Sequence, residues 1–110
     1  MKKPDAGRST LTGKQFDLIA KALADPRRMQ VLEVIAGEEE CPCQRLREEF
    51  PISKATISHH IKELVRAGLI EAHKDGQFLH CEVRREVLEA YTAELLRRTG
   101  ATVKGSVAQR

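Results

Sequence analysis

The most constraining feature of this sequence is the stretch from residue 53 to residue 83, SKATISHHIKELVRAGLIEAHKDGQFLHCEV. Ser53 suits the N-cap of a helix, and Gly68 suits its end. Between them, apolar residues recur at helical spacing, namely Ile57, Ile61, Leu64 and Val65. Two strand-like runs then surround Asp75-Gly76, a pair that favours a tight hairpin turn. The stretch therefore predicts a capped amphipathic helix followed by a β-hairpin.

Shorter helical patterns precede this stretch. One covers LTGKQFDLIAKALAD, and a second begins at Asp25-Pro26, because aspartate suits an N-cap and proline the first helical position. EEECPC is a connector whose alternation allows a small strand, and QRLREEF is a short helix. In the first helix, apolar residues recur at helical spacing at Phe16, Ile19, Ala20 and Leu23. The buried stripe of the second helix consists of Met29, Leu32 and Ile35, and in the short helix Leu46 and Phe50, four residues apart, are expected to support the helix that follows.

The final segment, RREVLEAYTAELLRR, predicts an amphipathic helix with Leu88, Tyr91 and Leu95 on one side. Together with Phe16, Ile19 and Leu23 of the first helix, these residues offer more apolar surface than so small a core can absorb, which favours a dimer. A short helix, a tight turn and a second capped helix form a helix-turn-helix, and the hairpin after it is a wing. The predicted fold is therefore mainly α with a small β-hairpin wing, a winged helix-turn-helix in the order α-α-(β)-α-α-β-β-α.

The size and charge of the chain fit one small domain. We expect a flexible N-terminus over residues 1–10, a winged helix-turn-helix domain for DNA binding and dimerisation over 11–98, and a flexible tail over 99–110. The formal charge of +3 permits a nucleic-acid partner. No apolar run is long enough to span a membrane, and no secretion signal is seen at the N-terminus. Three cysteines without an export signal predict the reducing cytoplasm.

The second helix of the motif has a polar outer face. Hydroxyl, imidazole and ammonium groups on such a face can contact base edges and phosphates, and the helix N-terminus suits a phosphate. A face that is merely solvated is the alternative for each residue taken alone. The predicted DNA-binding residues are Lys54, Ala55, Thr56, Ser58, His59 and Lys62 on the helix, with Lys74 and Gln77 beside the turn of the wing.

Together, LADPRRMQVLEVI, the S-x-x-x-I-S-H-H-I-x-x-L helix and the AGLI entry to a DGQ wing resemble the ArsR family of winged helix-turn-helix repressors. The resemblance covers roughly residues 15 to 97. It implies a homodimer joined through the first and last helices, which binds double-stranded DNA at an imperfect inverted repeat and is released by an inducer. It also implies that Lys54, Thr56, Ser58 and His59 face the bases. Ala55 stands where many relatives have proline.

Cys41 and Cys43 directly precede the first helix of the motif. Thiolates at this spacing can bind a thiophilic ion such as As(III), Cd(II) or Zn(II), and some relatives in the family bind metal through such a pair. Cys81 is the candidate third ligand, because a strand before the motif can pair with the returning strand of the hairpin. However, Leu46 lies one residue farther from Cys43 than in the arsenic-sensing pattern, and Cys81 shares a strand face with apolar residues. Metal sensing, redox sensing and packing all stay open for these thiols.

The predicted function is a DNA-binding transcriptional regulator, a homodimeric repressor that an inducer releases from its operator. The inducer would be a thiol-binding metal or metalloid, or an oxidant. The alternative is a winged-helix regulator that responds to a non-metal small molecule or serves as a protein-interaction module, with structural cysteines. An enzyme is not expected, because the sequence has no Cys-x-x-Cys at a helix start and no nucleophile–base–acid set.

Overall fold

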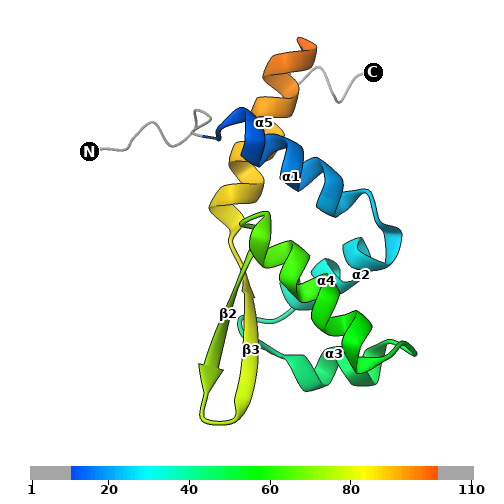
Figure 1. The fold of residues 1–110 in the computed structure, drawn as a ribbon. Helices are drawn as coiled ribbons and strands as arrows, with labels where there is room; N and C mark the ends of the chain where they lie inside the picture. Colours follow the sequence, from blue (N-terminus) through cyan, green and yellow to red (C-terminus); the bar gives the residue numbers. More distant parts are fainter. Residues whose placement is uncertain (1–10, 102–110) are drawn as a thin grey trace.

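A computed structural model describes residues 11–101 of the chain (Figure 1). The elements follow the predicted order, and the small strand before the motif is present, so the winged helix-turn-helix prediction is confirmed. They are α1 (Gly13–Leu23), α2 (Pro26–Ala36), β1 (Cys41–Pro42), α3 (Cys43–Glu49), α4 (Lys54–Arg66), β2 (Ile70–Asp75), β3 (Phe78–Val83) and α5 (Arg85–Thr99). Residues 1–10 and 102–110, which make up most of the two predicted flexible ends, lie outside the described residues.

Side-chain caps fix where the central helices begin. The carboxylate of Asp25 accepts hydrogen bonds from the backbone N–H groups of Arg27 and Arg28, at 2.9 and 3.1 Å. The hydroxyl of Ser53 accepts from the backbone N–H of Thr56 at 3.1 Å. Both caps satisfy N–H groups that have no partner inside their helix, which is why α2 and α4 begin where the sequence predicted.

The wing belongs to a three-stranded antiparallel sheet with the order β1-β3-β2. In β1, Cys41 is paired with Cys81 of β3, as the sequence predicted for a strand preceding the motif. The turn itself differs from the expectation by one residue: Asp75 pairs with Phe78, so the loop is Gly76-Gln77. Gly76 has a φ of +68°, and a glycine at the first loop position is typical of a type II′ turn.

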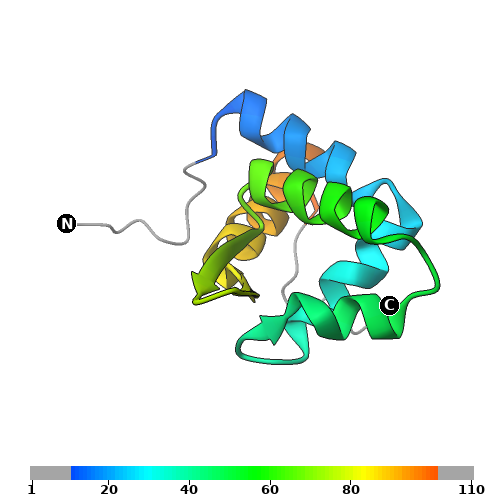
Figure 2. The ribbon, with the colours of Figure 1, turned by 60° about the horizontal axis from the view of Figure 1, so that its bottom comes forward.

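The core lies where α1, α2, α3, α4 and the base of the wing meet, and Figure 2 shows α1 running alongside α4. Its fully buried side chains include Ile19, Ile35, Leu46, Ile57 and Leu64. The prediction of burial is wrong for two residues, since Met29 is 37% exposed and Val65 is 42% exposed. Ala20 is exposed as well, and Ala22 packs inward in its place.

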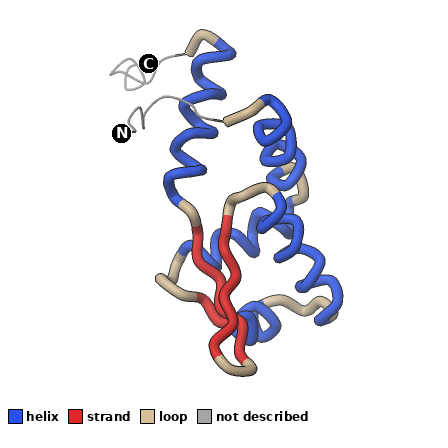
Figure 3. Tube along the Cα trace, turned by 60° about the vertical axis from the view of Figure 1, so that its left-hand side comes forward, coloured by secondary structure: helices blue, strands red, loops and turns tan. Residues whose placement is uncertain are grey.

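The wing and α5 extend in opposite directions from this core (Figures 1 and 3). Few contacts attach α5 to the other helices. The ring centroids of Tyr91 and Phe16 lie 4.9 Å apart. The guanidinium carbon of Arg98 lies 3.8 Å from the centroid of the Phe16 ring. The fold therefore presents α4 and the wing at one end and a loosely packed α5 at the other.

Candidate nucleic-acid interface

The inner face of α4 is anchored by apolar side chains. Leu46 and Phe50, from α3 and the turn after it, are buried as the sequence predicted. They support the buried face of α4, which consists of Ile57, His60, Ile61 and Leu64. Because this face is fixed to the core, the opposite face of α4 must point outward.

All eight residues predicted to contact DNA are exposed. Lys54 and Lys62 form no ion pair with any residue between positions 11 and 101, so both ammonium groups are available. The hydroxyl of Thr56 is already engaged, since it lies 2.9 Å from the hydroxyl of the capping Ser53. Gln77 lies in the two-residue loop of the wing, and Lys74 lies one residue before the last position of β2.

His59 and His60 are neighbours with opposite environments. His59 is exposed, whereas His60 is only 6% exposed and packs on the inner side of α4. Burial lowers the pKa of His60, and Asp25 opposes that change. Its Nδ1 atom is buried without a hydrogen-bond partner in the part of the chain that the structure describes. His60 is therefore a packing residue, and its lowered pKa favours the neutral form at pH 7.

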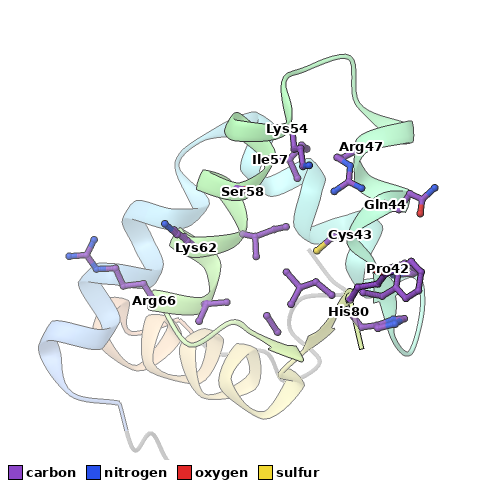
Figure 4. Close-up of a pocket in the computed structure, with 16 residues that line it drawn as sticks. Pro42, Cys43, Gln44, Arg47, Lys54, Ile57, Ser58, Lys62, Arg66 and His80 are labelled. Atoms are coloured by element: carbon purple, nitrogen blue, oxygen red, sulfur yellow. The ribbon is translucent and has the colours of Figure 1, made fainter. Parts of the chain in front are cut away.

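An open groove of about 920 Å³ separates α4 from the wing and α3 (Figure 4). Lys54, Ser58, Lys62 and Arg66 follow one another along α4 at intervals of four residues and line one side of it. Arg47 of α3 lines the facing side. Arg47 and Arg66 were not among the residues predicted from the sequence, although the four-residue spacing after Lys62 indicates Arg66.

The three cysteines are buried around β1 and β3. Cys41 and Cys81 are completely buried cross-strand partners, and Cys43 at the start of α3 is 6% exposed. The Sγ atoms of Cys43 and Cys81 lie 3.7 Å apart, at hydrogen-bond distance for thiols. The Sγ of Cys41 instead contacts the carbonyl oxygen of Pro42 at 3.7 Å. The close thiol pair is therefore Cys43 and Cys81.

This geometry fits part of the predicted metal site. Two thiolates bound to one tetrahedral Zn(II), each at about 2.3 Å from it, would be roughly 3.8 Å apart. Cys43 and Cys81 have this spacing, but Cys41 does not join them. Among the described residues, three metal-binding side chains converge within 4.8 Å at Glu71, His73 and Glu82 instead.

The thiol contact makes Cys43 and Cys81 unequal. The hydrogen bond from Cys81 stabilises the thiolate of Cys43 and lowers the pKa of Cys43, and Arg47 acts in the same direction. The same bond, together with burial, raises the pKa of Cys81. Burial raises the pKa of Cys41 to about 11. Of the three thiols, Cys43 is thus the one whose thiolate form is favoured most.

A second polar cluster lies on the wing strands. Glu71 and Glu82 are cross-strand partners, and Nε2 of His73 lies 3.5 and 3.4 Å from their nearest oxygens. Arg84 approaches Glu71 at 3.9 Å. All four side chains are well exposed, so we interpret the cluster as a surface ion-pair group.

The fold, together with this unpaired basic face, defines a winged helix-turn-helix DNA-binding protein. Residues 23–73 match the model of a helix-turn-helix domain family. The chain is 36% identical over 76 residues to the arsenical resistance operon repressor of Staphylococcus xylosus, covering 69% of this chain and 72% of that protein. It is 35% identical over 71 residues to the transcriptional repressor SdpR of Bacillus subtilis (strain 168), covering 64% and 78%.

A crystal structure of an ArsR family transcriptional regulator superimposes on this fold with a TM-score of 0.72 and 28% identity, covering 82% of this chain and 92% of that one. The chain belongs to the ArsR family and is a DNA-binding transcriptional regulator. None of the helices between residues 11 and 101 has the length and apolar composition that crossing a membrane requires.

Proposed function

We propose that the protein is a homodimeric, cytoplasmic repressor that binds an imperfect inverted repeat in double-stranded DNA. The observation that carries this proposal is the outer face of α4, where Lys54 and Lys62 have no ion-pair partner among residues 11–101, while the inner face is fixed in the core. A helix held in this way can enter the major groove with its side chains already oriented. Two-fold symmetry would then place two copies of α4 about one DNA turn apart.

We assign different roles to the exposed residues. Ser58 and His59 read base edges, and Ala55, which is exposed on the same helix, contacts a thymine methyl group. Lys62, Lys74 and Gln77 contact the backbone and supply affinity that does not depend on sequence. Lys54 and Thr56 lie in the first turn of α4, where the helix N-terminus also attracts a phosphate.

A comparison of His59→Ala with Lys62→Ala tests this assignment. Binding to operator DNA and to random duplex would be measured by fluorescence anisotropy over a range of salt concentrations. For His59→Ala we expect a loss of about 1–3 kcal/mol on operator with little change on random DNA. For Lys62→Ala both affinities should fall together, and the salt dependence should become shallower. Lys14→Ala, an exposed lysine on α1, is the control. Equal losses on both DNAs for His59→Ala would rule it out as a reader.

The thiols support a second step of the proposal, in which a thiophilic ion or an oxidant releases the DNA. The relative from Staphylococcus xylosus is an arsenical resistance operon repressor, and Cys43 and Cys81 are spaced for one soft ion. Cys43 begins α3, which supports α4, whereas Cys81 lies on the wing strand. As(III), Cd(II) or Zn(II) bound at the present spacing would tie α3 to the wing and restrict their relative movement, whereas oxidation to a disulfide would draw the two sulfurs together from 3.7 Å and move α3 relative to the wing.

Serine variants test the thiol step. Cys43→Ser should retain operator binding and lose release by As(III), Cd(II), Zn(II) or peroxide, because one sulfur of the close thiol pair is gone. Cys41→Ser should respond as the wild type does, since its sulfur lies outside the pair. Normal release by the same agents from a Cys41→Ser, Cys43→Ser double variant would show that these two cysteines only pack and that the sensor lies elsewhere.

A further inference from the structure

The groove between α4 and the wing has an apolar floor that DNA binding does not require. Its apolar lining consists of Ile57, Ile61, Val65, Phe78 and Leu79. Phe78 is 55% exposed, and Val65, which the sequence predicted to be buried, is 42% exposed. A folded chain usually covers such side chains, so their gathering around one hollow marks a binding surface. The sugar–phosphate backbone of DNA is polar, so contact with a phenyl ring adds little to its binding affinity.

The charged lining of the same groove has a single sign. Arg47, Lys54, Lys62 and Arg66 lie around the hollow, and none of the lining residues is an aspartate or a glutamate. The chain as a whole has 16 acidic residues against 19 basic ones, so this absence is local. The guanidinium of Arg66 forms an ion pair with the carboxylate of Glu63 at 3.6 Å. Arg47 and Lys54 form no ion pair with any other described residue. The groove therefore combines an apolar floor with free positive charge.

We propose that this groove binds an amphipathic organic anion, a small molecule with an apolar body and one carboxylate or sulfonate group. The apolar body packs on Phe78, Val65 and the isoleucines of α4, and the anionic group pairs with Arg47 and Lys54 at the rim. A volume of about 920 Å³ is in the range of pockets that hold drug-sized ligands. Medium-chain fatty acids and aromatic acids have this chemistry.

Such a ligand would act on DNA binding directly. This part of the inference rests on the proposed role of α4, because Lys54 and Lys62 would serve both the ligand and DNA. An anion seated against Lys54 neutralises a charge that a phosphate would otherwise use, and its body lies between α4 and the wing. Ligand and operator therefore compete, and by linkage each lowers the affinity of the other by the same factor.

The first experiment measures binding without DNA. The fluorescent probe 1-anilinonaphthalene-8-sulfonate is titrated into the full chain, and decanoate is used to displace it. We expect saturable binding of the probe, which decanoate reverses. Decanol, which lacks the charge, and acetate, which lacks the long alkyl chain, should displace the probe at least tenfold less well. Phe78→Ser and Arg47→Gln should each weaken the binding of both anions about tenfold or more. Met29→Ser, which changes an exposed apolar residue outside the groove, is the matched control.

Thermal unfolding of each variant separates loss of the site from loss of the fold. If Phe78→Ser or Arg47→Gln is unfolded at 25 °C, Phe78→Leu or Arg47→Lys is used in its place. These variants too should bind both anions more weakly than the wild type and Met29→Ser do. Equal binding of the probe by the Phe78 and Met29 variants would overturn the proposal, as would an absence of saturable binding to the folded wild type. In the latter case the groove serves DNA alone.

The second experiment adds operator DNA. Decanoate should release the wild type from operator and should be about tenfold less effective on Phe78→Ser, whose DNA contacts are intact. Equal release of both proteins would overturn the competition. If the wild type does not bind operator at all, the proposed DNA-binding function fails, while the fluorescence titrations still decide whether the groove is a ligand site.

Discussion

His60 illustrates how one residue position decides the role of a side chain. It follows His59 directly, but the helical turn of 100° per residue carries it from the outer face of α4 to the inner one. There it is almost fully buried with an unpartnered Nδ1 atom. The groups that influence its charge come from two elements: Asp25, Arg27 and Arg28 at the start of α2, and His59 on α4.

We predict that His60 makes the protein less stable in mild acid. Its pKa is lower in the folded chain than the ordinary value of 6.5, so the unfolded chain binds a proton more readily as the pH falls. The free energy of unfolding should therefore be unaffected above pH 6.5 and should decrease below it, by at most about 1.4 kcal/mol per pH unit. Chemical unfolding between pH 8 and about pH 5 measures this. His60→Leu should flatten the profile, and His59→Leu should not. Identical profiles for wild type and His60→Leu would contradict the assignment.

Val65 and Met29 show why residue-level prediction from the sequence stops where it does. Both occupy positions of a helical apolar stripe, and the pattern predicted burial for both. Periodicity gives the direction of a side chain but not what lies opposite it. The stripe on α4 is wider than the surface that the core covers, so Val65 falls at the edge of the groove. The exposed face of α4 was predictable, because it requires only the direction.

At the scale of elements, the pairing of β1 with β3 was predictable and the thiol contact was not. The sequence predicted that a strand before the motif could pair with the returning strand, and Cys41 lies opposite Cys81 as a result. The close sulfur contact is made by Cys43, because α3 begins at this residue and turns its side chain toward β3. A two-residue strand that passes directly into a helix leaves no sequence pattern from which to infer that turn.

The connection between α4 and the wing depends on Gly68. Its φ of +81° is a left-handed conformation, and a Cβ atom there would lie 2.9 Å from Nε2 of Gln15 on α1. We predict that Gly68→Ala lowers the free energy of unfolding by about 1–2 kcal/mol through backbone strain. The loss of stability should be larger if the side chain of Gln15 does not move aside. Gly13→Ala, where a Cβ meets nothing within 4 Å, is the control and should be neutral or stabilising. Chemical unfolding of both variants measures the difference, and equal stabilities would contradict the prediction.

At the scale of the whole molecule, α5 lacks a full packing partner within the described residues. The side of α5 that packs on the protomer is formed by Val87, Ala90 and Glu94, and Glu94 is held by Arg97 and Arg98. Leu95 is 40% exposed, on the apolar side predicted from the sequence. From α1, Ile19 was expected to share the same surface but is completely buried in the protomer. The surface left for a second copy is therefore smaller than the sequence indicated and is centred on α5.

We predict that Leu95→Glu converts the protein from a dimer to a monomer at micromolar concentration. A carboxylate at the centre of an apolar contact has no partner and must be desolvated when two copies associate. The substitution should leave a folded monomer, because Leu95 contributes little to the core of one protomer. Sedimentation equilibrium measures the mass, and anisotropy should show a loss of operator affinity, since a single α4 reads only one half of the repeat.

Met29→Glu is the matched control, because it places the same charge at an exposed apolar residue on α2. It should sediment as a dimer and bind operator normally. If wild type and Leu95→Glu both sediment as dimers, the two copies meet through another surface. A wild type that is monomeric while bound to operator would separate DNA recognition from dimerisation, because α4 and the wing would then suffice to hold one half-site without the partner.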